Sequence, residues 1–288
     1  MFERFDPRRI ETSEAEINLK IGGQGPALLL LHGYPQTHAI WHRVAPELAN
    51  KFTVVAADLR GYGDSSKPHG TPDHATYSKR AMARDQVEVM QQLGFEQFLV
   101  VGHDRGARVA HRMALDHAGA VRKLVVLDIV PTRTMYSRVS RDFAKSYYHW
   151  FFLLRPEPIP ETMIGANPKF YLEQHMGTRF AGLSAFAPEA MAEYVRCFSD
   201  PATIHASCED YRAAESIDLE HDEADLGKKI ECPLLALWGE KGTVHRCFKP
   251  LEDWRERAAD VRGRPLPCGH YIPEEAPADL LAELVKFL

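Results

Sequence analysis

Short apolar runs, separated by helical patterns, constrain the fold of this 288-residue chain more than any other feature. Four runs occur in the first half, at residues 27–31, 52–57, 98–102 and 121–127. Each is apolar along nearly its whole length, as strands are when helices cover both faces of a sheet. Candidate helices occupy residues 78–93 and 107–116, between runs. The pattern predicts an α/β fold with a mostly parallel central sheet and helices on both faces.

The strand pattern stops after Pro131 and returns at residues 232–238. Between about residues 132 and 225 the chain is rich in aromatic, proline and charged residues, with no comparable apolar run. We interpret this stretch as a helical cap inserted over the carboxyl ends of the strands. The core is therefore expected in two segments, 1–131 and 226–288, and the second ends in a helix at residues 277–288.

Charge and cysteine usage exclude several classes of partner. The formal net charge is -5 and there is no long basic run, which argues against nucleic acid as a partner. No stretch reaches the roughly 18 apolar residues of a membrane span, and the charged N-terminus does not look like a signal peptide. Five cysteines without a CxxC pair favour reduced thiols and a cytoplasmic location. The histidines match no recognised zinc spacing, so no metal is expected.

The segment Gly102-His103-Asp104-Arg105-Gly106 lies between an apolar run and a helical pattern. This is the context of the nucleophile elbow, G-x-nucleophile-x-G, in which a sharp turn presents a side chain above the sheet. The elbow commonly carries Ser, and here it carries Asp104. A carboxylate can attack saturated carbon and form an ester, which an activated water must then hydrolyse. The alternative is an ordinary turn in which Asp104 caps the following helix.

Two further residues complete a candidate catalytic triad, because in this fold the acid and then the histidine follow the nucleophile along the chain. Asp128 comes directly after the apolar run 121–127, and His270 lies in a loop before the last helix. Asp128 could instead be a strand-end cap or part of a buried ion pair, and His270 an ordinary surface histidine. The backbone N–H groups of Tyr34 and Arg105 are the predicted oxyanion hole.

With these motifs the chain resembles the Asp-nucleophile branch of the α/β hydrolases, which includes haloalkane dehalogenases, epoxide hydrolases and haloacetate dehalogenases. The resemblance covers essentially the whole chain. Haloalkane dehalogenases and many epoxide hydrolases carry Trp after the nucleophile, where this chain has Arg105, and Arg108 lies one helical turn onward. The resemblance to fluoroacetate dehalogenases implies that Arg105 and Arg108 bind a substrate carboxylate, for which guanidinium geometry is suited. Alternatively, Arg108 pairs with a surface acid.

The aromatic segment 147–152 resembles the cap segment of haloacetate dehalogenases. The resemblance implies that His149 and Trp150 donate hydrogen bonds to the departing halide and that Tyr211 is a third donor. Without the resemblance, the same segment would be interpreted as an aromatic core patch. An epoxide hydrolase would use two cap tyrosines as acids, for which Tyr147, Tyr148 and Tyr211 are candidates.

Together these features predict hydrolytic dehalogenation of short 2-haloacids, such as conversion of fluoroacetate or chloroacetate to glycolate and halide. The expected partner is a small anionic haloacid, with no metal or organic cofactor, and the family suggests a homodimer. An epoxide hydrolase with the same nucleophile is the alternative. A non-catalytic receptor on this scaffold is a third hypothesis, against which the complete triad counts. The preferred halogen and the range of acid chain lengths stay open.

Overall fold

The computed structural model describes residues 1–288 and contains one eight-stranded sheet with strand order β1-β2-β4-β3-β5-β6-β7-β8. The strands are β1 (Asp6–Glu11), β2 (Glu16–Gly22), β3 (Ala27–Leu31), β4 (Thr53–Ala57), β5 (Phe98–His103), β6 (Val121–Leu127), β7 (Leu234–Gly239) and β8 (Val261–Leu266). Strands β3 to β8 are parallel, whereas β1 and β2 pair antiparallel with each other and β2 with β4. The predicted mostly parallel sheet is confirmed.

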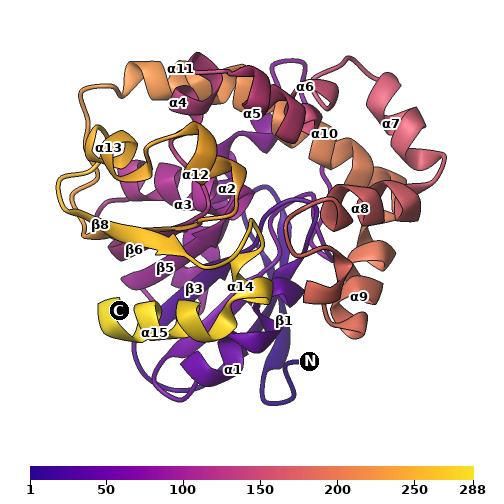
Figure 1. Ribbon diagram of the computed structural model, residues 1–288. Helices are drawn as coiled ribbons and strands as arrows, with labels where there is room; N and C mark the ends of the chain where they lie inside the picture. Colours follow the sequence, from indigo (N-terminus) through magenta and orange to yellow (C-terminus); the bar gives the residue numbers. More distant parts are fainter.

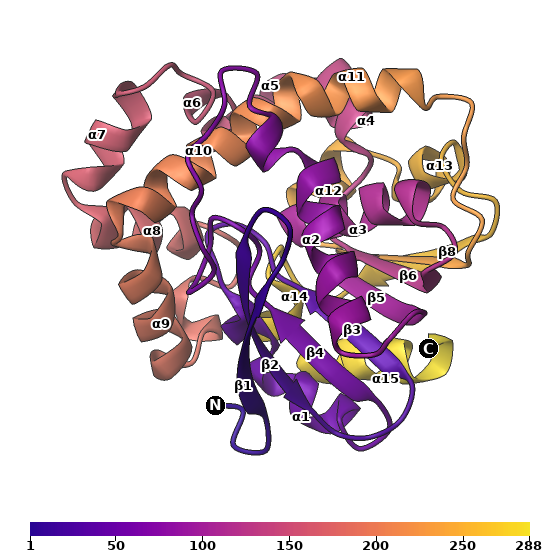
Figure 2. The ribbon, with the colours of Figure 1, turned by 180° about the vertical axis from the view of Figure 1, so that it is seen from behind.

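Two apolar cores lie on opposite faces of this sheet because successive strand residues point to opposite sides. On one face, Leu28 and Leu30 of β3 pack with α1 (Ala45–Leu48) and α15 (Pro277–Phe287). On the other, Leu29 and Leu31 pack with α2 (Lys79–Gln92) and α3 (Arg105–Asp116). Figure 1 shows α1 and α15 below the sheet. Figure 2, the view from behind, shows α2 and α3 on the opposite face of the sheet.

Between β6 and β7 the chain forms only helices, which arch over one side of the molecule in Figure 1. They are α4 (Thr132–Ser137), α5 (Arg141–Ser146), α6 (Tyr148–Phe152), α7 (Ile159–Gly165), α8 (Pro168–Gly177), η3 (Leu183–Ala185), α9 (Pro188–Phe198), α10 (Pro201–Glu215) and α11 (Ile217–Ala224). The division into a core (1–131 and 226–288) and a cap (132–225) stays a prediction, because helical content alone does not define a separate unit.

Three strands had not been predicted from the sequence, namely β1, β2 and β8. Most residues of β1 are exposed and charged, and β8 alternates half-buried and exposed positions. Neither therefore has the continuous apolar run that identified the inner strands. The remaining short helices are η1 (His38–Arg43), η2 (Ala75–Tyr77), α12 (Thr243–Cys247), α13 (Pro250–Arg255) and α14 (Ile272–Glu275).

The turn from β5 into α3 brings the helix against neighbouring backbone at two glycines. A Cβ on Gly106 would lie 2.3 Å from the carbonyl oxygen of His32, and a Cβ on Gly102 would lie 2.5 Å from the Cα of Ala107. Both contacts are with backbone, which cannot move aside as a flexible side chain would. The packing of the turn therefore requires glycine at both positions.

Replacement of Gly106 by Ala should destabilise the fold, because its Cβ would collide with the β3 backbone. Overpacking of this kind typically lowers the free energy of unfolding by about 1–3 kcal/mol. Gly119→Ala is the matched control, since a Cβ there meets nothing within 4 Å. Urea unfolding of both variants measures the difference. Equal stabilities would show that the turn can relax around the added methyl group.

Candidate active site

Asp104 occupies the turn between β5 and α3, in a backbone conformation that side chains rarely adopt. Its φ is +47°, and the residue is 5% exposed. Its side chain makes no capping hydrogen bond to α3. Instead Oδ1 accepts a hydrogen bond from the backbone N–H of Tyr34 at 3.1 Å. Asp104 therefore occupies the N-cap position of α3 without capping the helix through its side chain, and the turn presents the carboxylate at the carboxyl ends of the parallel strands.

The charges around Asp104 keep it ionised despite its burial. Burial by itself raises the pKa of the carboxyl, but the electrostatic influence of the neighbouring His270 and His103 imidazoles and of the Arg105 and Arg108 guanidiniums lowers it more, so that the pKa lies below its ordinary value. A carboxylate with a lowered pKa is deprotonated at neutral pH. Asp104 is thus available as an anionic nucleophile in a site that largely excludes water.

His270 and Asp128 form the hydrogen-bonded pair that the sequence order predicted. Nδ1 of His270 lies 2.6 Å from Oδ2 of Asp128. The other carboxylate oxygen, Oδ1, accepts a hydrogen bond from the backbone N–H of Gly239 at 3.0 Å. With Nδ1 facing a carboxylate, the tautomer that carries its proton on Nδ1 leaves Nε2 as the basic atom. Asp128 is at the end of β6, so its position depends on the sheet itself.

The loop that carries His270 is held from two sides. Glu275 accepts hydrogen bonds from the backbone N–H groups of Gly269, at 2.6 Å, and Tyr271, at 2.9 Å. Nε2 of His103 lies 2.8 Å from the carbonyl oxygen of His270. Burial lowers the pKa of His103 to about 3, so this imidazole is neutral and can donate that hydrogen bond. These contacts fix the backbone on both sides of His270.

The two backbone groups predicted as an oxyanion hole lie on either side of Asp104. The Tyr34 N–H already contacts the carboxylate. Arg105 is the first residue of α3, and its N–H therefore has no acceptor within the helix. Gly33 makes the approach possible, because a Cβ there would lie 2.5 Å from the Cβ of Asp104.

Arg105, which the sequence led us to expect as a ligand of the substrate carboxylate, is buried and held by a bidentate ion pair with Asp210 of α10. Nε donates to Oδ2 at 2.9 Å, and Nη2 donates to Oδ1 at 2.6 Å and to the Asp210 carbonyl at 2.7 Å. Only Nη1 is buried without a partner. Arg105 can therefore donate to a substrate carboxylate from one nitrogen only, and cannot bind it through two nitrogens. Tyr211 lies beside it, with its ring 4.2 Å from the guanidinium carbon.

Arg108 is also buried, and no acid pairs with it, so the surface-acid alternative is wrong. Nη1 donates to Oγ1 of Thr132 at 2.8 Å and to the Val130 carbonyl at 3.3 Å, and Nη2 contacts the sulfur of Met135 at 2.8 Å. Nε has no partner. Each arginine thus retains one unpartnered nitrogen, and the pair could hold a carboxylate with one N–H from each.

The three residues predicted as halide ligands, His149, Trp150 and Tyr211, come together beside the two arginines. The ring centroid of Tyr211 lies 5.7 Å from that of His149 and 6.0 Å from that of Trp150. The Arg108 guanidinium carbon lies 4.8 Å from the centre of the Trp150 ring. The indole N–H of Trp150 and Nδ1 of His149 are buried without a hydrogen-bond partner. Buried donors without partners need an explanation, and an anion bound between these side chains would supply the missing hydrogen bonds.

All three side chains are uncharged under ordinary conditions. Burial, together with the neighbouring His175 and Arg179, lowers the pKa of His149 well below its usual range. Burial and the Asp104 carboxylate raise the pKa of Tyr211 well above its usual range. His149 is therefore a neutral imidazole and Tyr211 a protonated phenol. Such donors can replace the hydration shell of an anion without adding a second cation to the site.

Sequence reasoning missed three residues that shape the site. Asp210 holds Arg105, the His175 ring packs 4.5 Å from that of His149, and the Arg179 guanidinium carbon lies 4.7 Å from the centre of the Tyr147 ring. All three lie in the helical stretch between β6 and β7, where the sequence offers no motif. The one available signal was an acidic residue directly before Tyr211, which is too common to identify a role.

Comparison with known proteins places the whole chain among hydrolases. The family model of the alpha/beta hydrolase fold matches residues 26–277. A fluoroacetate dehalogenase from Burkholderia sp. is 51% identical over 289 aligned residues, which cover 100% of this chain and 95% of the relative. A soluble epoxide hydrolase from Corynebacterium sp. (strain C12) is 34% identical, with coverage of 92% and 91%.

The same arrangement of elements occurs in solved structures. A structure from Nostoc sp. PCC 7120 superimposes with a TM-score of 0.97 at 60% identity, covering 100% of this chain and 99% of the other. The strand order, the helical insert and the positions of the strand ends thus belong to a known architecture.

Asp210→Asn should be strongly destabilising, because it leaves the buried Arg105 guanidinium without its counter-ion. Breaking one side of a buried pair typically costs about 3–5 kcal/mol. Glu223→Gln is the matched control: its partner Arg133 lies 2.8 Å away, but both side chains are exposed. Loss of an exposed pair costs about 0–1 kcal/mol. Denaturant midpoints measure both variants, and similar losses would contradict the role assigned to Asp210.

Proposed function

This chain belongs to the α/β-hydrolase fold family, and from that premise we propose that it hydrolyses the carbon–halogen bond of short 2-haloacids. The observation that carries the proposal is a buried, ionised Asp104 bordered by two arginines, each with one unpartnered nitrogen, and by a cluster of neutral donors. The Burkholderia fluoroacetate dehalogenase, 51% identical over the whole chain, supports the same substrate class.

In the first step, the substrate carboxylate binds between Nη1 of Arg105 and Nε of Arg108, which both lack partners. Charge-assisted hydrogen bonds of this kind are stronger than neutral ones and fix direction as well as position. Because Asp210 holds the rest of the Arg105 fork, the accepting nitrogen is already oriented before the substrate arrives. Bound in this way, the haloacid has its Cα near Asp104.

In the second step, a carboxylate oxygen of Asp104 attacks Cα and the carbon–halogen bond breaks. An ester forms between Asp104 and the two-carbon acid, and the halide leaves with the electron pair of the broken bond. His149, Trp150 and Tyr211 donate hydrogen bonds to the halide. This replaces water around a small anion at the moment when its charge develops, which is where donors lower a barrier most.

In the third step, Nε2 of His270 accepts a proton from a water molecule that attacks the carboxyl carbon of the Asp104 ester. Asp128 stabilises the resulting imidazolium through the 2.6 Å contact with Nδ1. The Tyr34 and Arg105 N–H groups bind the oxyanion of the tetrahedral intermediate. Its collapse releases the hydroxy acid and regenerates the Asp104 carboxylate, which now carries an oxygen atom from water.

Epoxide hydrolysis is the competing function, because the 34% identical relative from Corynebacterium is a soluble epoxide hydrolase. That reaction would need two tyrosines aimed at an epoxide oxygen. Tyr148 is 50% exposed, and the hydroxyl of Tyr147 lies 3.4 Å from Nδ1 of His270 rather than free in the site. Of the three candidates, only Tyr211 packs on one of the two arginines, with its ring 4.2 Å from the guanidinium carbon of Arg105, which favours the haloacid.

Halide release from fluoroacetate and chloroacetate, followed with a fluoride electrode and a chloride assay, tests the proposal. The wild-type protein should release halide, and Asp104→Asn should abolish release while retaining the fold, because an amide cannot form the ester. Styrene oxide is the comparison substrate. Release of no halide, together with hydrolysis of the epoxide, would contradict the proposal in favour of the epoxide hydrolase. No turnover of any of the three would favour a receptor.

Trp150→Phe should lower fluoride release more than chloride release, because it removes one N–H donor and keeps an aromatic ring. Loss of a donor at a developing anion typically slows a reaction by about 10²–10³, and fluoride holds its hydration shell more tightly than chloride. Trp238→Phe is the control, since its indole N–H donates to Nδ1 of His245 at 3.0 Å, outside the donor cluster. An unchanged ratio of fluoride to chloride release would argue against the halide site.

Two predictions about the protein as a whole accompany this function. We propose a homodimer and a cytoplasmic location, as expected from the sequence. None of the helices combines the length and the apolar character that a membrane crossing would require.

A further inference from the structure

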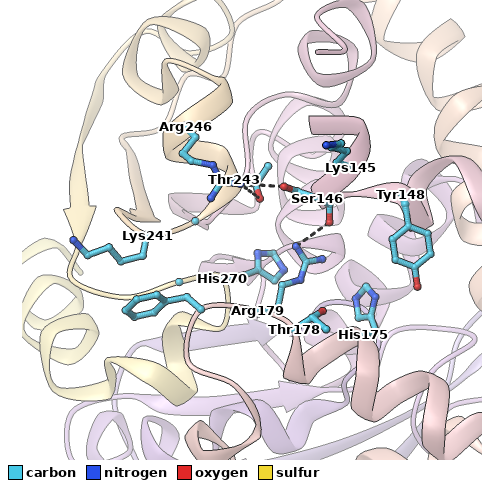
Figure 3. Close-up of a pocket in the computed structure, with 13 residues that line it drawn as sticks. Lys145, Ser146, Tyr148, His175, Thr178, Arg179, Lys241, Thr243, Arg246 and His270 are labelled. Atoms are coloured by element: carbon cyan, nitrogen blue, oxygen red, sulfur yellow. Dashed lines mark hydrogen bonds between the residues drawn. The ribbon is translucent and has the colours of Figure 1, made fainter. Parts of the chain in front are cut away.

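A cavity of about 310 Å³ opens beside the triad, between the helical insert and the loops that follow β7 and β8. Figure 3 shows its labelled side chains, with Arg246 and Arg179 on either side of Ser146 and His270 next to Arg179. The lining residues come from α5, from α8 and the segment after it, and from the region around α12. The cavity thus joins parts of the chain on both sides of the candidate active site.

The charged side chains that line this cavity, apart from its histidines, are all cations. Lys145, Arg179, Lys241 and Arg246 line it, and no Asp or Glu does. Lys241 pairs with its neighbour Glu240 at 2.9 Å. The other three cations form no salt bridge, although the chain as a whole has a net charge of -5. A concentration of unpaired cations at one opening therefore runs against the overall charge of the protein.

Neutral partners hold two of these cations in place. Arg246 donates to Oγ of Ser146 at 3.0 Å and to Oγ1 of Thr243 at 3.4 Å. Arg179 donates to the carbonyl oxygen of Ser146 at 3.4 Å and lies over the Tyr147 ring. These contacts orient the guanidinium groups without neutralising them. Both groups therefore retain their full charge for an anion in the cavity.

The cavity also borders the catalytic triad and lies close to the cluster of candidate halide donors, His149, Trp150 and Tyr211. His270 contributes to its lining, and so does His175. The His175 ring packs 4.5 Å from that of His149, the candidate halide donor. An anion in the cavity would therefore border the triad directly at His270 and would be separated from the donor cluster by the His175 side chain.

We propose that this cavity is an anion-binding vestibule, in which Lys145, Arg179 and Arg246 capture the carboxylate of the haloacid before it passes to Arg105 and Arg108. The inference rests on the proposed function for the identity of the anion. A cleft lined by charge of one sign raises the association rate of an opposite ion about 10- to 10³-fold, and salt suppresses the effect. Because the Debye length falls from about 10 Å at 0.1 M salt to about 3 Å at 1 M, high salt screens the attraction between these cations and an approaching carboxylate.

The first test measures association in a protein that cannot turn the substrate over. Binding of fluoroacetate to Asp104→Asn is followed by stopped-flow tryptophan fluorescence, with Trp150 as the reporter, at increasing ionic strength. When Lys145→Gln and Arg246→Gln are introduced together into Asp104→Asn, association should slow about tenfold at low salt. This is the low end of the effect that charge in a cleft has on association rates. The difference should vanish near 1 M salt. Adding Lys51→Gln, an exposed lysine at the opposite end of the sheet, should change nothing.

The second test does not depend on turnover. Acetate, which carries the carboxylate but no halogen, is titrated into the wild-type protein while the arginine Nε–Hε resonances are followed by NMR. Arg179→Lys and Arg246→Lys identify the two signals by their loss. Both signals should move with acetate, and the Arg246 signal should move less in Lys145→Gln.

The outcomes separate the two proposals. Equal association rates at low salt, or arginine resonances that do not move with acetate, overturn the vestibule even if the enzyme releases halide. Resonances that move in a protein that releases no halide uphold the vestibule while the haloacid function fails.

Discussion

Keeping Asp104 ionised while it is buried is the constraint on which the rest of the structure depends. Taking a carboxylate out of water is costly, and the group becomes protonated unless nearby charges and donors compensate. Here the two arginines supply positive charge, the His270 and His103 imidazoles lie alongside, and the Tyr34 N–H supplies a hydrogen bond. The elbow adds a further cost, since a non-glycine residue at φ +47° is strained by about 1–3 kcal/mol. Tight packing of Gly33, Gly102 and Gly106 around the turn holds this conformation.

The two arginines beside Asp104 are restrained in different ways, and together these restraints orient the site in advance. A carboxylate from the insert holds Arg105, whereas neutral oxygens and a sulfur hold Arg108. Asp210 also accepts a hydrogen bond from Tyr62 at 2.6 Å and pairs with Lys79, both from the core half of the chain. The insert and the core are therefore joined by a buried charge network centred on Asp210, next to the reacting groups. Small changes in this network would alter both stability and substrate alignment.

The sequence was sufficient for features that depend on local pattern. Strands β3, β5 and β6 were visible because both of their faces are buried, and the elbow was visible because its glycines and nucleophile are adjacent. Strands β1 and β8 lie at the edges of the sheet, where exposed faces carry charge and the apolar run disappears. The Arg105–Asp210 pair joins residues more than a hundred positions apart, and no local spacing announces it. Likewise, the unpaired cations around Arg179 form a cluster only after folding.

The central claim is that Asp104 is a covalent nucleophile, and intact-mass spectrometry of a trapped intermediate tests it most directly. His270→Gln should still form the ester but should not hydrolyse it. After incubation with chloroacetate, this variant should gain the mass of one carboxymethyl group, and peptide mapping should place it on Asp104. The double variant with Asp104→Asn should remain unmodified. An unmodified His270→Gln protein, from an enzyme whose wild type releases chloride, would contradict the covalent mechanism, and so would an adduct on another residue.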